Sequence, residues 1–247
     1  FSFTRIRGQS SSVALGQLKL YDFTADRAQK RSSARPHDGS CRAVRFAVDG
    51  ASVFSAGSDA SLQQRDLETN KPAWRKRKAH GAAINSMARL AEVGIATGDD
   101  EGEVKMWDLR QRTCALQFHE NREIISDMVY TQKGSGHTLC AGSGDGMLSV
   151  FDLRAGKLWA RSDDQEDELL SLALLKGGRK LVCGTESGTL GIFSWGNFGD
   201  ITDRLLGHPQ SVHGGHFGVP RVGEPRLRAR RLLTSDGGPL LRQVDCM

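Results

Sequence analysis

The chain has 247 residues, of which 38% are hydrophobic and 26% are charged, and its formal net charge is +5. With 29 glycines and only 6% aromatic residues, the composition favours a β-rich fold with many tight turns over a helical bundle. No apolar stretch approaches the roughly 20 residues that cross a bilayer, so we expect no membrane partner. The positive charge weakly favours an anionic partner.

Five segments along the chain share one pattern and one spacing. They are residues 15–23, 59–67, 101–109, 145–153 and 187–195. The small turn residues within them lie 44, 42, 44 and 42 positions apart, and they are Gly16, Ala60, Gly102, Gly146 and Gly188. A repeat of this length is typical of a β-propeller, in which each blade is a four-stranded sheet. The pattern predicts about five blades, the first of them partial.

Each repeat unit has the residue pattern of strands joined by tight turns. Strand-like stretches open the units at residues 43–46, 84–87, 124–128 and 170–174. Residues 93–96 predict the next strand, and the dipeptide that ends in Gly102 suits a two-residue hairpin because glycine tolerates a positive φ. The following strand alternates and ends on an aromatic residue such as Trp107. We therefore predict an all-β chain.

The repeat pattern fails near the C-terminus. Residues 213–231 contain Pro220 and Pro225, which cannot join a central strand ladder, and they lack apolar alternation. We divide the chain into propeller blades over 1–212 and a degenerate or disordered segment over 213–247, so that the C-terminal end of the propeller is incomplete. Because the chain begins at Phe1 without an initiator methionine, we expect the start of the gene product to be missing.

Several motifs together resemble the WD repeat-containing protein 55 family of nucleolar WD40 propellers. They lie between residues 41 and 212 and read CRAVRF (41–46), KAHGAAINSM (78–87), ATGDDEGEVKMWDLR (96–110), SGDGMLSVFDLR (143–154) and NFGDITDR (197–204). The resemblance implies a propeller of seven blades, of which about five are recognisable here. It also implies a non-enzymatic scaffold of the nucleus and nucleolus, with the cytoplasm as an alternative location. Its role would be to hold pre-ribosomal factors in ribosome biogenesis and rRNA production, and contact with RNA stays open.

WD40 blades contain a buried hydrogen-bond network, and the resemblance assigns its roles to particular residues. His80, Thr97, Asp100 and Trp107 fill these roles most completely, with Glu101 as an alternative to Asp100. A buried indole or imidazole nitrogen without a partner costs about 1–3 kcal/mol. We therefore favour a structural role for these residues over a catalytic histidine–acid pair.

Two arginines are candidate partner contacts. Arg110 ends the stretch WDLR, and Arg154 ends the similar stretch FDLR. The WDxR pattern resembles the box of WD40 substrate receptors of cullin-4 ubiquitin ligases, in which this arginine faces the adaptor protein. The alternative function is therefore a substrate receptor or adaptor of such a ligase. The simpler interpretation is that each arginine pairs with a surface carboxylate, which contributes under about 1 kcal/mol.

The basic run Arg75, Lys76, Arg77 and Lys78 is a further candidate partner site. Four consecutive cations suit nuclear import or contact with RNA phosphates, and they equally suit a solvated outer strand. No aromatic residues alternate with them, which argues against single-stranded RNA binding by base stacking.

The sequence offers no residue set for catalysis, a cofactor, a metal ion or a small-molecule substrate. His213 and His216 have no third ligand at metal-binding spacing, and Gly188 belongs to a turn rather than to a phosphate loop. The five cysteines form no CxxC pair, and several lie in apolar strand-like runs, which indicates a reducing compartment. We therefore predict that the protein is not an enzyme.

Overall fold

The computed structural model describes residues 3–6, 9–14, 16–23, 28–91, 94–175 and 177–205. These residues form twenty strands and no helix. The strands pair into five four-stranded sheets, and every pairing is between antiparallel neighbours in the sequence. None of the described segments is a helix capable of spanning a membrane.

Each sheet is built from four consecutive strands, and we number the sheets 1 to 5 in chain order. Sheet 1 comprises β1 (Phe3–Ile6), β2 (Gln9–Ala14), β3 (Gln17–Phe23) and β4 (Ala28–Ala34). Sheet 2 comprises β5 (Cys41–Phe46), β6 (Ser52–Gly57), β7 (Leu62–Asp66) and β8 (Pro72–Lys76). Sheet 3 comprises β9 (Ile84–Leu90), β10 (Gly94–Asp99), β11 (Val104–Asp108) and β12 (Thr113–Phe118). Sheet 4 comprises β13 (Ile125–Lys133), β14 (Gly136–Ser143), β15 (Leu148–Asp152) and β16 (Lys157–Arg161). Sheet 5 comprises β17 (Leu169–Leu175), β18 (Lys180–Thr185), β19 (Leu190–Ser194) and β20 (Asp203–Leu205).

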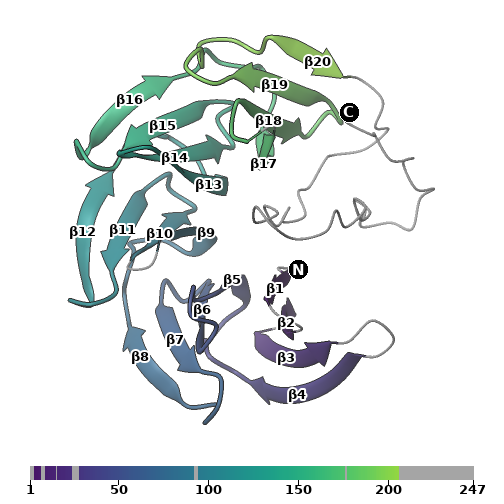
Figure 1. Cartoon of the computed structure of the whole chain (residues 1–247), viewed down its shortest axis with the longest axis vertical. Helices are drawn as coiled ribbons and strands as arrows, with labels where there is room; N and C mark the ends of the chain where they lie inside the picture. The colour runs from purple at the N-terminus through teal and green to yellow at the C-terminus, as the bar shows by residue number, and fades with distance from the viewer. Residues whose placement is uncertain are drawn as a thin grey trace.

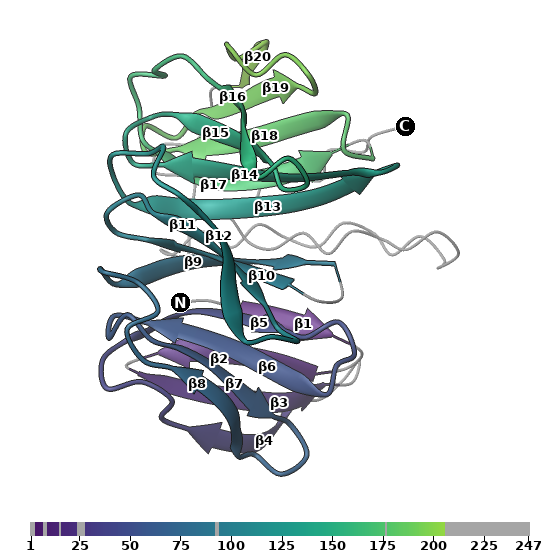
Figure 2. The same cartoon turned by 90° about the vertical axis from the view of Figure 1, so that its left-hand side faces the viewer.

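The five sheets follow one another around a common centre, as blades of a propeller do (Figure 1). The first strand of each sheet lies on the inner side, where β9 contacts β5 and β13, and β13 contacts β17. The fourth strand lies at the periphery (Figure 1). The side view shows sheet 3 between sheets 1 and 2 on one side and sheets 4 and 5 on the other (Figure 2). The prediction of an all-β propeller with about five blades is confirmed. Sheet 1, for which the sequence predicts a partial blade, has four paired strands.

The apolar core is divided into four clusters, and each fills the space between two successive sheets. Leu18 of sheet 1 packs with Val44 of sheet 2, and Phe54 of sheet 2 packs in one cluster with Trp107 of sheet 3. The next two clusters join sheets 3 and 4 and sheets 4 and 5. Burial of these flanks stabilises the fold because apolar area contributes about 25 cal/mol per Å² removed from water.

The turns between the second and third strands explain the periodic small residues. Gly16, Gly102, Gly146 and Gly188 have φ values of 76°, 84°, 75° and 85°, and Ala60 has 54°. The prediction of a positive φ is therefore confirmed. The prediction of a two-residue hairpin at Gly102 is wrong, because residues 100–103 lie between the end of β10 and the start of β11. The longer loop closes through the amide of Asp99, which donates to the carbonyl of Glu103.

Ala60 is the one member of this set that has a side chain in the left-handed region. That conformation costs a non-glycine residue about 1–2 kcal/mol, whereas glycine adopts it freely. We therefore expect Ala60→Gly to stabilise the protein by about 0.5–1 kcal/mol after the larger unfolded-state entropy of glycine is subtracted. Thermal unfolding should show a higher Tm. Ala56→Gly, within strand β6, is the control and should lower Tm; a fall in Tm for both variants would contradict the prediction.

Three cysteines lie inside strands of the core. Cys41, Cys140 and Cys183 are buried and free. Burial raises the pKa of Cys41 and Cys140 to about 12 and that of Cys183 to about 11. These thiols stay protonated at neutral pH, and the prediction that cysteines in the apolar runs behave as small buried hydrophobes is confirmed.

The segment over 213–247, for which the sequence predicts degeneracy or disorder, lies outside the described residues. His213 and His216 belong to that segment, so their assessment as poor metal ligands stays a prediction.

Candidate functional site

A buried side-chain network joins two strands of sheet 3, β10 and β11, to the loop before β9. Nε1 of Trp107 donates to Oγ1 of Thr97 over 2.8 Å, and Nε2 of His80 lies 2.7 Å from the same oxygen. Nδ1 of His80 lies 2.9 Å from Oδ2 of Asp99. All four residues are buried. The structure thus brings His80, Thr97 and Trp107 together, as the family resemblance implies.

The chemistry of the groups fixes the direction of these hydrogen bonds. A carboxylate only accepts, so Nδ1 of His80 carries the hydrogen that faces Asp99. Nε2 then accepts from the hydroxyl of Thr97, whose oxygen is left to accept from the indole of Trp107. One hydroxyl therefore satisfies two buried nitrogens. The role of the network is to hold the loop before β9 against β10 and β11.

The acid of this network is Asp99, which corrects the assignment of Asp100. Asp99 is the last residue of β10, and its Oδ1 also accepts two backbone amides of the following turn, at 3.0 and 2.9 Å. Asp100 is the next residue and lies in the turn that follows β10. Its carboxylate pairs with Arg42 of β5 at 2.6 Å, which ties sheet 2 to sheet 3.

Glu103 adds a second carboxylate beside His80. Its Oε2 lies 3.3 Å from Nδ1 of His80 and 3.0 Å from Nζ of Lys105. The donor atoms of His80, Asp99 and Glu103 lie within 4.8 Å of one another, which is close enough to consider a metal site. However, Lys105 and the backbone amides already supply protons or positive charge to these oxygens. The arrangement therefore fits a hydrogen-bond network better than a cation site.

Sheet 2 contains a second network that sequence reasoning missed. Nδ1 of His37 lies 2.9 Å from Oδ1 of Asp59 and 2.8 Å from Oγ of Ser61, and Nε2 lies 3.0 Å from Oγ of Ser55. The signal was present in the sequence, because His37 precedes His80 by 43 positions, which is one repeat. It is weak because Arg65 replaces the tryptophan and binds the side chain of Gln63 at 3.2 Å instead.

Sheet 4 keeps only a remnant of the network. Asn121 stands where the histidine would be, and its Oδ1 accepts from the hydroxyl of Ser149 at 2.6 Å. Phe151 occupies the tryptophan position and is fully buried, with its ring stacked on that of Phe118 at a centroid distance of 4.4 Å. Apolar packing has replaced the polar interior in this sheet.

The network of His37 and Asp59 predicts that acid destabilises the fold. Burial lowers the pKa of His37 below 6.5. Burial would raise the pKa of Asp59, but hydrogen bonds from Ser61, the Asp38 amide and His37 outweigh it and lower that pKa to about 2. The unfolded chain therefore binds more protons than the native one, first below pH 6.5 at His37 and then below 3.8 at Asp59.

The free energy of unfolding should consequently fall as the pH is lowered from 7.5 to 5.5, and again from 5 to about 3. Urea denaturation at these pH values measures it. His37→Asn should flatten the first step and leave the second, whereas Asp59→Asn should reduce the second. A wild-type protein that is equally stable at pH 7.5 and 5.5 would contradict the assignment of His37.

Arg110 and Arg154 occupy equivalent turns after β11 and β15. Both are exposed. Asp108 and Asp152 shape these turns, since each Oδ1 accepts the backbone amide of the arginine two residues on, at 2.8 and 2.9 Å. Within the part of the chain that the structure describes, neither guanidinium group has a hydrogen bond or ion pair. The simple interpretation that each arginine pairs with a surface carboxylate therefore has no support in the structure.

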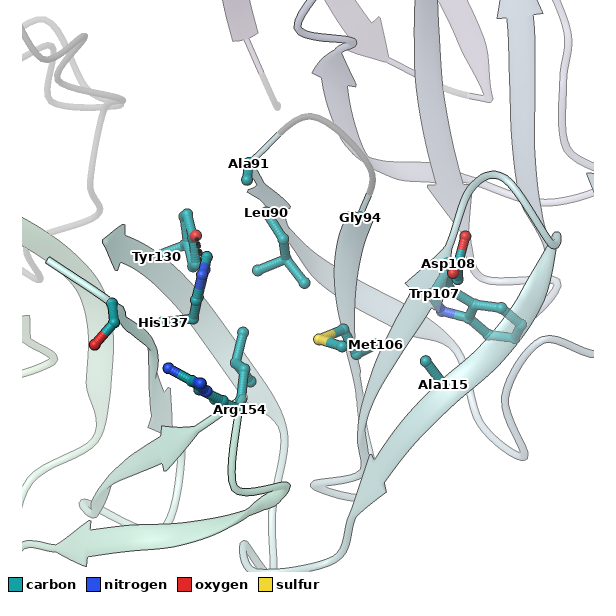
Figure 3. A pocket seen from close by; sticks show the side chains of 12 residues that line it. Leu90, Ala91, Gly94, Met106, Trp107, Asp108, Ala115, Tyr130, His137 and Arg154 are labelled. Carbon is teal, nitrogen blue, oxygen red and sulfur yellow. Dashed lines mark hydrogen bonds between the residues drawn. The ribbon is translucent and has the colours of Figure 1, made fainter. Parts of the chain in front are cut away.

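A pocket of about 500 Å³ lies beside these turns, between sheets 3 and 4. Leu90 and Met106 of sheet 3 face Tyr130, His137 and Arg154 of sheet 4 across it (Figure 3). The hydroxyl of Tyr130 and Nδ1 of His137 are hydrogen bonded to each other at 2.7 Å. The pocket combines an apolar interior with an arginine at its border, and sequence reasoning did not find it.

The structure separates the members of the basic run. Arg75 is half-buried and pairs with Asp59 at 3.1 Å and with Asp38 at 3.4 Å. Lys76, Arg77 and Lys78 are exposed. Arg75 thus stabilises the region around the His37 network, and the three exposed cations are the part of the run that faces solvent.

The motif NFGDITDR forms the outer edge of sheet 5. Phe198 is buried, with its ring 5.3 Å from that of Trp195 and 5.5 Å from that of Trp159. The carbonyl of Gly199 accepts the amide of Asp163 at 2.7 Å. The motif therefore fastens sheet 5 to sheet 4, which gives this family signature a structural role.

Comparison with known proteins finds several relatives that are named WD repeat-containing protein 55. WD repeat-containing protein 55 of Arabidopsis thaliana is 42% identical over 192 residues, which is 77% of this chain and 54% of the relative. The homolog of Dictyostelium discoideum is 36% identical over 201 residues, 81% of this chain and 48% of the relative. WD repeat-containing protein 55 of Bos taurus is 33% identical over 199 residues, 80% of this chain and 52% of the relative.

No family model matches the chain. The chain spans about half the length of the curated relatives that it matches. Over the half of these relatives that it spans, the chain is similar to proteins named WD repeat-containing protein 55.

Proposed function

We propose that this protein is a non-enzymatic scaffold that binds other proteins in nucleolar ribosome biogenesis and rRNA production. The similarity to proteins named WD repeat-containing protein 55 and the resemblance of the sequence motifs support the process, the nuclear and nucleolar location, and pre-ribosomal factors as partners. The observation that carries the scaffold role is that the His80–Asp99 pair, the candidate for a catalytic histidine–acid pair, is buried inside sheet 3. Its imidazole is fully buried and serves the interior of sheet 3, so it has no access to a substrate.

Affinity purification of the tagged chain, followed by mass spectrometry, tests this proposal. We expect pre-ribosomal proteins to be enriched over a tag-only control, and the chain to co-sediment with pre-ribosomal particles in a sucrose gradient. A tagged chain that recovers no pre-ribosomal protein would contradict the assigned process. Treatment of the lysate with ribonuclease before purification separates partners held by protein contact from those held through RNA.

A second candidate is a substrate receptor or adaptor of a cullin-4 ubiquitin ligase. It is favoured by the equivalent positions of Arg110 and Arg154, which are exposed and lack a partner among the described residues. An arginine in this state can pair bidentately with carboxylates of another protein. The double variant Arg110→Ala/Arg154→Ala should lose pull-down of the ligase adaptor and keep co-sedimentation with pre-ribosomal particles. Unchanged adaptor pull-down by the double variant would exclude this use of the two arginines.

A further inference from the structure

We propose that the pocket between sheets 3 and 4 binds a peptide segment of a partner protein that carries carboxylates next to a large apolar side chain. The proposal rests on the scaffold function and adds the place and the chemistry of recognition. It is carried by two features: an apolar interior, and a border whose cations have no partner among the residues that the structure describes.

The interior of the pocket is suited to an apolar side chain. Leu90, Met106 and Leu153 contribute aliphatic or thioether surface, and the volume of about 500 Å³ is within the range of ordinary ligand sites. Met106 and Leu90 project into the space between the two sheets (Figure 3). Filling such a space with an apolar side chain removes apolar surface from water on both partners, which is the main source of binding energy in protein interfaces.

The polar groups of the lining leave one charge available to a ligand. The carboxylate of Asp108 accepts two backbone amides of its own turn. Tyr130 and His137 are bonded to each other. Of the two formally charged side chains in the lining, Arg154 is the one that has no interaction with the described residues. A carboxylate placed beside the apolar anchor would pair with it.

The turns on either side extend this positive border. Residues 108–112 begin at the last residue of β11 and contain the exposed Arg110 and Arg112. Residues 152–157 run from the last residue of β15 to the first residue of β16 and contain the exposed Arg154 and Lys157. Each turn has two cations and a single aspartate, whose carboxylate is bound to turn amides. Both borders are therefore net positive, which favours an acidic partner and disfavours a basic one.

The chemistry of the walls favours a peptide over single-stranded RNA. RNA bases bind by stacking on open aromatic faces. The ring of Tyr130 is already stacked on His137, with an angle of 25° between the rings and 6.1 Å between centroids. On the opposite wall, Trp107 is buried and bonded to Thr97, and Leu90 and Met106 are not aromatic. A mainly apolar slot with cations at its edge matches an acidic segment with a leucine, isoleucine, methionine or phenylalanine anchor.

Selection from a random dodecapeptide library on the full 247-residue chain tests the inference. We expect a consensus with Asp or Glu within a few positions of a large apolar residue. The Kd of the best peptide is then measured by fluorescence anisotropy with the wild type and three variants. Arg154→Glu reverses the border charge, and Ala115→Trp fills the pocket from an exposed position on β12. The matched control is Arg77→Glu, which makes the same charge change at an exposed residue between β8 and β9.

Loss of one charge-assisted contact predicts a Kd about tenfold higher or more for Arg154→Glu. Ala115→Trp should weaken binding by a similar factor, while Arg77→Glu should stay within about twofold because Arg77 is exposed and does not line the pocket. Tm values equal to wild type show that the variants are folded. A basic or uncharged consensus, or equal effects of Arg154→Glu and Arg77→Glu, would overturn the proposal.

Two further outcomes separate this inference from the scaffold function. A chain that binds acidic peptides through Arg154, yet recovers no pre-ribosomal protein from cells, would keep the pocket and contradict the assigned process. A single-stranded RNA that displaces the peptide and loses affinity with Ala115→Trp would assign the pocket to nucleic acid and overturn the inference.

Discussion

Thr97→Val should lower the free energy of unfolding by about 2–5 kcal/mol, because one hydroxyl serves two buried nitrogens. Valine has nearly the shape of threonine, so the packing of β10 changes little. The indole N–H of Trp107 and Nε2 of His80 lose their common partner, at present 2.8 and 2.7 Å away. Each buried polar atom left without a partner costs about 1–3 kcal/mol.

Urea denaturation followed by tryptophan fluorescence measures this loss. Thr97→Ser is the matched control, since it keeps the hydroxyl and removes only a methyl group, and it should cost about 1 kcal/mol. A thermal scan should place the valine variant clearly below the serine variant in Tm. If the two variants were equally stable, the hydroxyl of Thr97 would not be what holds His80 and Trp107.

The parts of the fold that the sequence predicts well are those fixed by backbone geometry. A residue with positive φ must recur once in every blade, so Gly102, Gly146 and Gly188 show the repeat directly. Apolar alternation in the strands likewise predicts the buried flanks. Both signals are local, and each is repeated along the chain, which makes them readable without knowledge of tertiary contacts.

The candidate site was harder to predict because it depends on one-residue differences and on contacts between sheets. Asp99 and Asp100 are adjacent and chemically identical, and only the end point of β10 decides that the first faces His80 and the second Arg42. The pocket is formed by Leu90 and Arg154, which belong to different sheets. No pattern within one repeat contains that information.

Substitutions at the repeat positions also make it hard to predict from the sequence how each blade stabilises its interior. Arg65 in place of tryptophan makes sheet 2 look degraded, although His37 keeps three polar partners there. Sheet 4 shows the opposite exchange, in which Phe151 and Phe118 replace polar contacts with a stacked pair. A blade can therefore hold its interior by hydrogen bonds or by apolar packing, and the sequence motif alone does not show which.

Phe151→Ala should be at least as destabilising as the loss of the Thr97 hydroxyl, at about 3–5 kcal/mol. Phe151 is fully buried in the cluster between sheets 3 and 4, and its ring is stacked on Phe118 of β12. Truncation removes apolar surface from the core and leaves a cavity that the antiparallel sheets cannot easily close. Phe151→Leu keeps most of the apolar volume and should cost clearly less.

A double-mutant cycle with Phe118→Ala tests whether contact between sheets is what matters. Because the two rings lie in different sheets with centroids 4.4 Å apart, their coupling energy should be about 0.5–1.5 kcal/mol. Additive effects, measured by urea denaturation, would mean that each ring acts only within its own sheet. A positive coupling energy requires that sheets 3 and 4 stabilise each other through their flanks. The shape of the pocket then also depends on this contact, since its two walls belong to these two sheets.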